Sequence, residues 1–279
     1  MKDVPGAAGS LSGCHSLSQT VRRGPLRVWY RPDSPVPMTS ADMLDCLESS
    51  GRPTRADVKL LKRYRRRSIF SMENNGLPIV IKAFPFERIK DAWRWRKYAP
   101  AELGNNLRAG SLGIPVPVCY GLFCVRRYGL VVNCGIVMEQ LCNHTDLAQL
   151  SATNESQVFR AIPTLVSMYT TGVHHLDVNP SNFFFNNETG RTVIIDWQKC
   201  EFQAPRNDAQ LVLQGAHFLN YSQVALAGAL WTDWVGELHR QSACGLGLLE
   251  LQNEIHRAQE TTRRPGKSFQ AGAILSRAA

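Results

Sequence analysis

The stretch that decides the fold reads TGVHHLDVNPSNFFFNNETGRTVIIDWQK and spans residues 171–199. It contains His175, Asp177 two residues later, then Asn182, and it reaches Asp196 after two apolar runs. Phosphoryl transfer from ATP needs a carboxylate that receives or orients the acceptor hydroxyl, and it needs oxygen ligands that hold magnesium against the phosphates. The stretch therefore predicts Asp177 as the base, and Asn182 and Asp196 as magnesium ligands.

The two apolar runs, 183–185 and 192–195, predict short strands that are joined by a turn at 186–190. A hairpin of this kind brings Asn182, which precedes the first strand, to the same end as Asp196, which follows the second. The predicted local structure and the predicted metal chemistry therefore agree.

The alternative is a hairpin with incidental polar residues, in which His175 is a buried core histidine and Asp177 is a cap. Any one of these residues alone would favour that interpretation. The ordered set of four residue types, together with two strand patterns, favours the phosphotransfer site instead.

Length and composition describe a globular chain of enzyme size. The 279 residues are 44% hydrophobic, which is enough for two lobes or for one large domain with a sizeable core, and which excludes a disordered protein. The formal charge of +9 and the pI of about 9.3 predict an anionic partner. A phosphate-bearing small molecule, a nucleic acid and an acidic membrane surface all fit this charge.

The eight cysteines show no C-x-x-C pair and no zinc-ligand spacing, so the sequence predicts a reduced, cytosolic protein. Residues 11–14 resemble a lipoprotein cleavage box, but the residues before them lack the apolar segment of a signal peptide. No stretch approaches the roughly 18 apolar residues of a membrane helix, so we expect any membrane association to be peripheral.

Lys82 lies in the middle of an apolar strand pattern at 79–84. A lysine in this position is costly unless its ammonium reaches an anion or solvent, which makes Lys82 a candidate for holding ATP phosphates. The alternative is a lysine on the solvent face of an edge strand. Glu102, in a basic helical stretch at 86–107, is the preferred ion-pair partner, because Glu87 follows Lys82 too closely for a helix to return it.

The remaining patterns predict the order of the elements. Residues 1–24 show no periodicity and are expected to be mobile, as is the tail at 261–279. Further strands are predicted at 26–30, near 119–120 and at 130–138, and helices at 40–47, 146–150, 158–169, from about 209, 226–238 and 248–255. Pro163 is expected to kink the helix at 158–169 or to move its start.

With these residues in view, the chain resembles the protein-kinase-like superfamily. More closely, it resembles the bacterial lipopolysaccharide core kinases, which phosphorylate Kdo or heptose sugars. The resemblance covers about residues 55–200. The closer match rests on the sequences at 65–70, 97–103, 113–117 and 172–177.

The resemblance implies an α+β, bilobal protein-kinase-like fold with a small β-rich N-lobe, residues 25–137, and a larger, mainly helical C-lobe, residues 138–260. It also implies ATP and magnesium as cofactors, and His175 as a catalytic residue beside Asp177. The segment with Glu139 and Leu141 would be the hinge whose backbone binds adenine.

The chain departs from the protein-kinase pattern at several places. No G-x-G-x-x-G precedes Lys82, Asp196-Trp197-Gln198 replaces D-F-G, and Asn179 stands where protein kinases often carry a lysine. There is no A-P-E segment either, and the interval after Asp196 is too short for a long peptide-docking loop. These departures argue against a protein kinase, but they remove neither the base nor a metal ligand.

We therefore expect an ATP- and magnesium-dependent phosphotransferase that acts on a sugar hydroxyl of a lipid-linked lipopolysaccharide core precursor. It would be cytoplasmic, with peripheral association at the inner face of the bacterial inner membrane. No obligate protein partner and no nucleic acid are expected. The basic run at 59–67 could contact nucleotide, acceptor or membrane, and the sequence leaves this open.

There are three alternatives, of which the first is also an enzyme. A small-molecule kinase of the aminoglycoside or choline type is disfavoured by the excess of Lys and Arg, because such enzymes bind cationic acceptors. A pseudokinase scaffold is disfavoured by the intact catalytic positions. Nucleic-acid binding through Tyr64, Trp93 and Trp95 among the cations is the third alternative.

Overall fold

A computed structural model describes residues 17–49, 57–64, 67–222, 224 and 228–262. The chain divides into two units. Unit 1 comprises Met1–Arg108 and Val118–Gln140, and unit 2 comprises Ala109–Pro117 and Leu141–Ala279. The interval 109–117 therefore groups with unit 2, which the sequence-based boundary after residue 137 did not anticipate. The expectation of mobility falls outside the described residues for 1–16 and 263–279.

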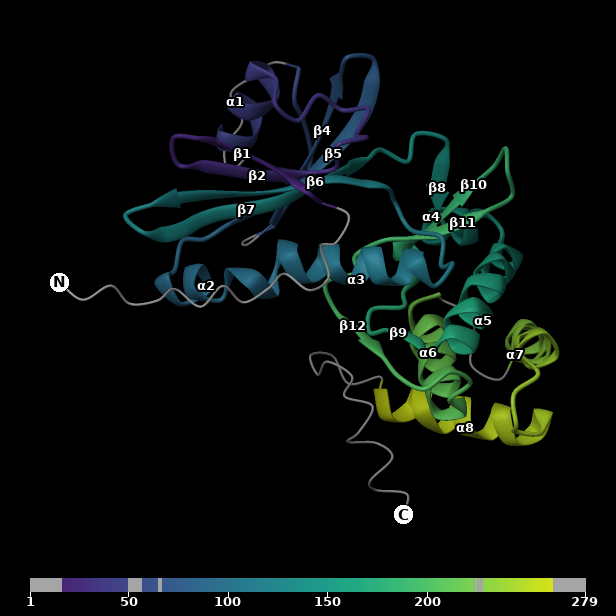
Figure 1. The fold of residues 1–279 in the computed structure, drawn as a ribbon. Helices are drawn as coiled ribbons and strands as arrows, with labels where there is room; N and C mark the ends of the chain where they lie inside the picture. The colour runs from purple at the N-terminus through teal and green to yellow at the C-terminus, as the bar shows by residue number, and fades with distance from the viewer. Residues whose placement is uncertain (1–16, 50–56, 65–66, 223, 225–227, 263–279) are drawn as a thin grey trace. The chain divides into compact units, whose positions relative to one another are not determined.

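Unit 1 is built on a seven-stranded antiparallel sheet (Figure 1). Its strands, in spatial order, are β1 (Gln19–Arg23), β2 (Leu26–Tyr30), β6 (Cys119–Arg127), β7 (Leu130–Glu139), β5 (Leu77–Pro85), β4 (Arg67–Asn74) and β3 (Lys59–Tyr64). The predicted strands are present. β1 was not predicted, because it lies in the segment for which the sequence shows no periodicity.

Helices cover both faces of this sheet, α1 (Ala41–Ser49) on one face and α2 (Ile89–Trp93), η1 (Trp95–Lys97) and α3 (Ala99–Ser111) on the other (Figure 1). Ile81 and Ala83 of β5 belong to the apolar core that includes residues of α1, whereas Phe84 packs with Ala99 and Leu103 of α3. Because side chains alternate along a strand, Lys82 lies on the same face as Phe84. Because β5 is buried on both faces, its sequence is nearly continuously apolar.

The single helical stretch predicted at 86–107 is instead three helices. Asp91 and Ala92 of α2 are buried, and the Tyr98 hydroxyl donates to Asp91 Oδ1 at 3.2 Å. Pro100 stands at the second position of α3, where its missing N–H breaks no helical hydrogen bond. Pro100 is therefore compatible with the start of a new helix at Ala99.

Unit 2 is mainly helical and carries two small sheets. Its helices are α4 (Leu147–Thr153), η2 (Glu155–Ala161), α5 (Ile162–Thr171), η3 (Pro180–Asn182), α6 (Asp208–Tyr221), α7 (Ala229–Ser242) and α8 (Leu248–Thr262). One sheet has the order β11 (Thr192–Ile194), β10 (Phe183–Asn186), β8 (His144–Asp146), and the other pairs β12 (Cys200–Phe202) with β9 (Val173–His175). Pro163 lies in the first turn of α5, so it moves the helix start, which is one of the two outcomes expected.

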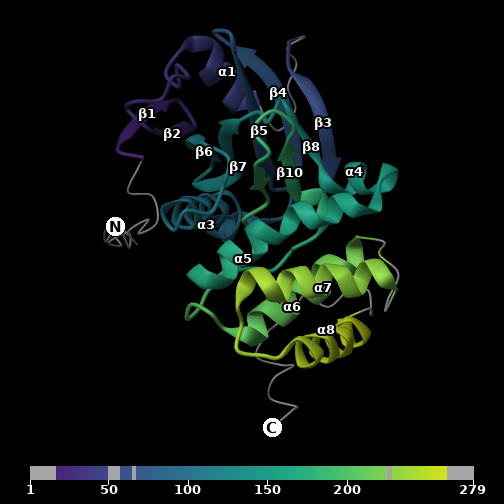
Figure 2. The same cartoon turned by 90° about the vertical axis from the view of Figure 1, so that its right-hand side faces the viewer.

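The core of unit 2 lies among α5, α6, α7 and α8, which pack on one another (Figure 2). Phe218 of α6 stacks on Trp234 of α7 with ring centroids 5.5 Å apart, and its edge contacts Phe183 of β10. The predicted hairpin is thereby fixed to the helical core. The predicted α+β class, with a β-rich N-terminal part and a mainly helical C-terminal part, is confirmed. Across the described residues, no helix has both the length and the apolar character needed to cross a bilayer.

Candidate active site

The loop between β9 and β10 carries the catalytic motif, and His175 fixes its start. The His175 ring is buried and lies edge-on to Trp197, with centroids 4.9 Å apart. Its Nδ1 accepts the Asp177 backbone N–H at 3.3 Å, so Nε2 carries the proton and donates to Ile195 O at 3.1 Å. Burial lowers the pKa of His175, which keeps the ring neutral. His175 thus ties the backbone of Asp177 to the residue before Asp196.

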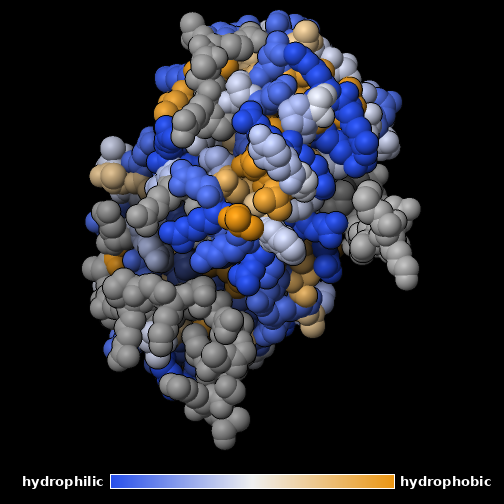
Figure 3. Space-filling view, turned by 90° about the vertical axis from the view of Figure 1, so that its left-hand side faces the viewer, coloured by the Kyte–Doolittle hydropathy of each residue, from blue (hydrophilic) through white to orange (hydrophobic). Residues whose placement is uncertain are grey.

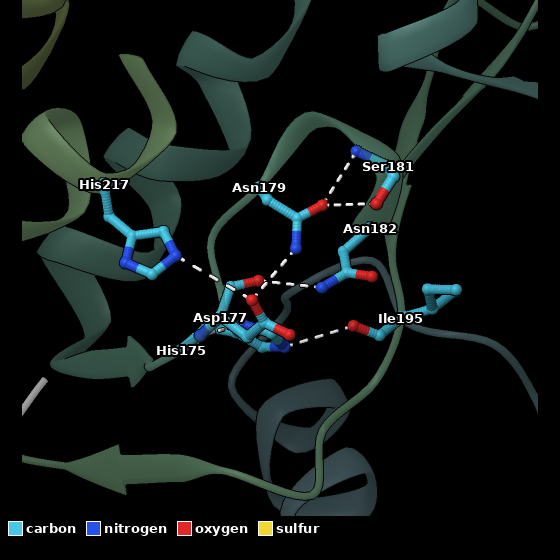
Figure 4. Close-up of polar contacts among 7 residues, drawn as sticks. All are labelled: His175, Asp177, Asn179, Ser181, Asn182, Ile195 and His217. Atoms are coloured by element: carbon cyan, nitrogen blue, oxygen red, sulfur yellow. Dashed lines mark hydrogen bonds and ion pairs between the residues drawn. The ribbon is translucent and has the colours of Figure 1, made fainter. Parts of the chain in front are cut away.

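The Asp177 carboxylate is half-exposed and receives polar contacts from two sides (Figure 4). Asn179 Nδ2 donates to Oδ1 at 2.9 Å, and His217 Nε2 of α6 lies 3.8 Å from the same oxygen. His217, followed by Asn179, holds the pKa of Asp177 well below the ordinary carboxyl value, against the opposing effect of burial. Asp177 is therefore an ionised acceptor whose orientation is set before any substrate arrives.

Asn182 is held by its amide nitrogen. Nδ2 donates to Asp177 O at 2.8 Å, which leaves the side-chain oxygen as the acceptor end of the amide. The Ile195 N–H donates to Asn182 O at 3.0 Å, and Phe183 pairs with Ile194 across the hairpin. Asn182 and Asp196 therefore lie at the same end of the predicted hairpin, which is present.

Asp196 has a backbone φ of +66°, in the left-handed region that side chains other than glycine rarely adopt. Strained backbone of this kind is found preferentially at functional sites. One amide oxygen and one carboxylate are ligands that magnesium accepts when substrate phosphates supply the rest. The described residues hold no cluster of three or more His, Cys, Asp or Glu side chains that could bind a metal.

In unit 1, Lys82 and Glu102 form the predicted ion pair. Lys82 Nζ lies 2.6 Å from Glu102 Oε1, and both side chains are buried, with 7% and 3% of their surface exposed. The alternative of a lysine on a solvent-facing edge strand is wrong, because β5 lies inside the sheet between β4 and β7. The pair fixes an ammonium group on the face of the sheet that α3 covers.

The predicted hinge residues make local contacts. The Glu139 backbone N–H donates to Val118 O at 2.9 Å, and a Glu139 carboxylate oxygen accepts the Val118 N–H at 2.8 Å. Leu141 O accepts the His144 N–H at 3.3 Å. The Glu139 carboxylate thus secures the start of β6, and adenine binding by this segment stays a prediction.

Sequence reasoning missed His217. It lies in a helix far along the chain from Asp177, and it reads there as an ordinary member of a helical pattern. The ring is buried to 8% exposure and stacks on Tyr221 with centroids 4.9 Å apart. The available signal was the departure at Asn179, since the usual lysine is missing and a cation from elsewhere could take its place beside Asp177.

His174, which is buried beside His175, leads us to expect that the protein loses stability in acid. Burial, with smaller contributions from His175 and His217, lowers the pKa of His174 from 6.5 to about 4. The unfolded chain therefore binds protons that the folded chain rejects, so stability is complete above the unfolded pKa and is lost as the pH falls towards the folded one. We expect His174 alone to lower the free energy of unfolding by about 2 kcal/mol between about pH 7 and pH 5.

Urea unfolding at these two pH values measures the effect. His174→Gln should flatten the pH dependence, because it removes the buried imidazole that binds a proton only on unfolding. An unchanged pH dependence in His174→Gln would contradict the prediction.

The chain is similar to a known protein family. The model of the lipopolysaccharide kinase (Kdo/WaaP) family matches residues 87–219. The matched stretch contains Glu102, the whole catalytic loop, Asp196 and His217, and it begins after Lys82. Among the curated proteins, none matches the chain.

Two solved proteins are similar in structure. One structure is described as WaaP in complex with acyl carrier protein, with a TM-score of 0.53 and 15% identity over 74% of this chain and 89% of that chain. The other is a crystal structure of WbdD, with a TM-score of 0.45 and 16% identity over 78% of this chain and 49% of that chain. At this level of identity the WaaP likeness shows the fold alone. The resemblance predicted from the sequence is confirmed by the family match.

Proposed function

We propose that this chain, which the family match identifies as a kinase, transfers the γ-phosphoryl group of ATP to a sugar hydroxyl of a lipid-linked lipopolysaccharide core precursor, with magnesium. One observation carries the proposal. The Asn182 amide is oriented by Asp177 O on a hairpin that ends at Asp196, so the base and both candidate metal ligands belong to one hydrogen-bonded unit.

Each residue has a role that follows from its contacts. Asp177, ionised and oriented by Asn179 and His217, accepts a hydrogen bond from the sugar hydroxyl and directs its oxygen toward the phosphorus. The Asn182 side-chain oxygen and the Asp196 carboxylate would hold magnesium, which when bound neutralises charge on the phosphates. Lys82, paired with Glu102, would contribute an ammonium to the nucleotide phosphates.

The ion pair supports a prediction with two readouts. Lys82→Met should weaken ATP binding, and it should also cost about 3 kcal/mol of stability, because Glu102 keeps a buried charge without its ion-pair partner. The double variant Lys82→Met/Glu102→Leu should regain most of the stability without regaining turnover. Thermal unfolding and ATP titration measure the two effects, and a double variant as unstable as the single one would contradict the buried-charge explanation.

His217 is the proposed positioning residue for Asp177. His217→Gln should reduce kcat by roughly tenfold, leave ATP affinity unchanged, and move the acid limb of the kcat–pH profile upward, since His217 contributes most to the low pKa of Asp177. His217→Lys should recover part of kcat by placing a nitrogen donor beside the Asp177 carboxylate again. Tyr221→Phe, which keeps the stacked ring, is the control. An unshifted pH profile in His217→Gln would assign His217 a packing role only.

Charge supports an anionic acceptor, since the chain carries a formal +9 and phosphorylated core sugars are anionic. We propose a cytoplasmic enzyme that associates peripherally with the membrane holding its acceptor. The similar WaaP structure contains an acyl carrier protein, so the absence of an obligate protein partner stays a prediction for this chain.

Mass spectrometry of the lipopolysaccharide core tests the acceptor. Cells that lack the protein should lose one phosphate group from a core sugar, and the parent gene should restore it where Asp177→Asn does not. An unchanged core would refute the acceptor class. Purified protein with ATP and a panel of aminoglycosides and choline tests the small-molecule alternative, and absence of ATP turnover with every acceptor would favour the pseudokinase.

A further inference from the structure

The short segment formed by α2 and η1 exposes two large apolar side chains. Ile89 is 68% exposed and Trp93 is 75% exposed, and their spacing of four residues places them on one side of α2. The charged residues exposed around them, of which five are cationic and one is acidic, are Arg88, Lys90, Arg94, Arg96, Lys97 and Glu87. The segment therefore combines apolar anchors with a surplus of positive charge.

The opposite side of the segment is fixed to unit 1. Asp91 and Ala92 are buried, and the Tyr98 hydroxyl donates to Asp91 Oδ1. The Tyr98 ring also contacts Phe86, with centroids 5.0 Å apart. The exposure of Ile89 and Trp93 is thus imposed by a packed element. Because the Asp91 carboxylate faces inward, the cations dominate the outer surface.

Figure 3 views the molecule from the side on which α2 lies in Figure 1. That face carries a hydrophobic area among mostly hydrophilic residues, and the exposed fractions of Ile89 and Trp93 are what assign two large apolar side chains to α2. Tryptophan beside an aliphatic side chain, with Lys and Arg around both, is the composition of elements that rest at a membrane interface. There the apolar groups enter the boundary of the acyl chains and the cations meet anionic headgroups.

Two other exposed basic surfaces fit this chemistry less well. Leu60 and Leu61 lie where the register of the edge strand β3 with β4 shifts, and at 49% and 47% they are less exposed than Ile89 and Trp93. The Tyr64 ring is contacted by the cations of Lys62 and Arg67. Arg65 and Arg66 of the predicted basic run lie outside the described residues. At the β6–β7 turn, only Tyr128 protrudes among the large apolar side chains of the described residues there.

We infer that the exposed side of α2 and η1 docks on a bilayer surface that contains anionic lipid. The inference deepens the proposed function, because it names the surface by which the enzyme would reach a lipid-linked acceptor. It replaces the run at 59–67 as the membrane contact. Acidic proteins and nucleic acids are the competing occupants.

Vesicle co-sedimentation of the full chain, without ATP or acceptor, tests the inference. The vesicles are phosphatidylcholine alone, or phosphatidylcholine with phosphatidylglycerol. The parent should bind the anionic vesicles, and Arg94→Gln/Arg96→Gln should bind them about 25-fold more weakly, since each cation near the surface contributes about fivefold. Ile89→Ser/Trp93→Ser should weaken binding by roughly tenfold. The single variant Trp93→Ser serves if the double variant fails to fold.

Lys62→Gln/Arg63→Gln on β3 is the matched control, because it removes the same charge from another exposed basic surface. It should weaken binding by less than about threefold at moderate salt, where distant charges are screened. An effect as large as that of Arg94→Gln/Arg96→Gln would overturn the inference, because binding would then follow net charge. The inference would also be overturned if the parent did not bind anionic vesicles but bound RNA or polyglutamate through Arg94 and Arg96.

The vesicle assay separates this inference from the proposed function. The substituted residues belong to α2, η1 and β3 of unit 1 and not to the catalytic loop, so turnover with an acceptor analogue that lacks the lipid should equal that of the parent. Vesicle binding without any phosphotransfer would keep the docking surface and reject the function. Phosphotransfer without vesicle binding would reject the docking surface and keep the function.

Discussion

Replacement of Asp196 by alanine is expected to abolish magnesium-dependent phosphotransfer in a protein that still folds. Asp196 carries the charge of the proposed metal site, because Asn182 supplies only a neutral oxygen. Without the carboxylate, the charge on the phosphates is no longer balanced where Asp196 would hold the cation. We expect kcat/KM to fall on the order of 10³-fold or more, as for other losses of several kcal/mol of electrostatic stabilisation.

Asp196→Asn distinguishes charge from shape. Asparagine tolerates the left-handed backbone at φ +66° and keeps one side-chain oxygen, so this variant should fold as the parent does and still lose most activity. ATP turnover across a magnesium titration is the measurement, and Asp233→Asn on the exposed side of α7 is the control. Nearly unchanged turnover in a folded Asp196→Ala variant would remove Asp196 from the metal site.

Local patterns predicted the hairpin, and with it the position of Asn182 and Asp196 at one end, because the information was local. Asn182, the two strands and Asp196 lie within one short stretch. The antiparallel pairing of β10 with β11 brings the start of the first strand to the end of the second. Lys82 could be paired with Glu102 because a buried lysine requires an anion, and because Glu87 follows Lys82 too closely. These predictions needed no knowledge of distant contacts.

Tertiary contacts decided what the sequence could not show. β1 forms because its backbone pairs with β2, although its own sequence QTVRR carries little apolar signal. His217 meets Asp177 only because α6 packs beside the catalytic loop. The sequence places the two residues far apart, and nothing in the pattern of α6 distinguishes His217 from a core residue.

The structure explains two departures from the protein-kinase motif, at Trp197 and at Asn179. Trp197, where D-F-G has phenylalanine, is buried, donates from Nε1 to Ile194 O at 2.9 Å and packs against His175. The larger aromatic ring therefore keeps a packing role and adds a hydrogen bond. Asn179, in place of lysine, binds the Asp177 carboxylate and also accepts the Ser181 N–H, and His217 is the second side chain beside that carboxylate.

Asp177→Asn should slow phosphotransfer by about 10³-fold and leave the affinity for ATP within about twofold, because a base acts on the transition state more than on the bound nucleotide. The substitution keeps an oxygen that Asn179 Nδ2 can reach, so the loop should keep its shape. What is lost is the negative charge that draws the hydroxyl proton. Single-turnover kinetics with a phosphorylatable acceptor, beside ATP titration by fluorescence, measures both quantities.

Stability provides the internal check on this variant. The pKa of Asp177 is lowered in the folded protein, so its carboxylate contributes stability above the unfolded pKa of 3.8, and this contribution is lost as the pH falls further. Asp177→Asn should therefore be slightly less stable at neutral pH, by about 1 kcal/mol or less for a half-exposed group, and the difference should vanish in acid. If the variant instead lost ATP binding together with a large part of its stability, Asp177 would be a structural residue, and the base would have to be sought elsewhere on the loop.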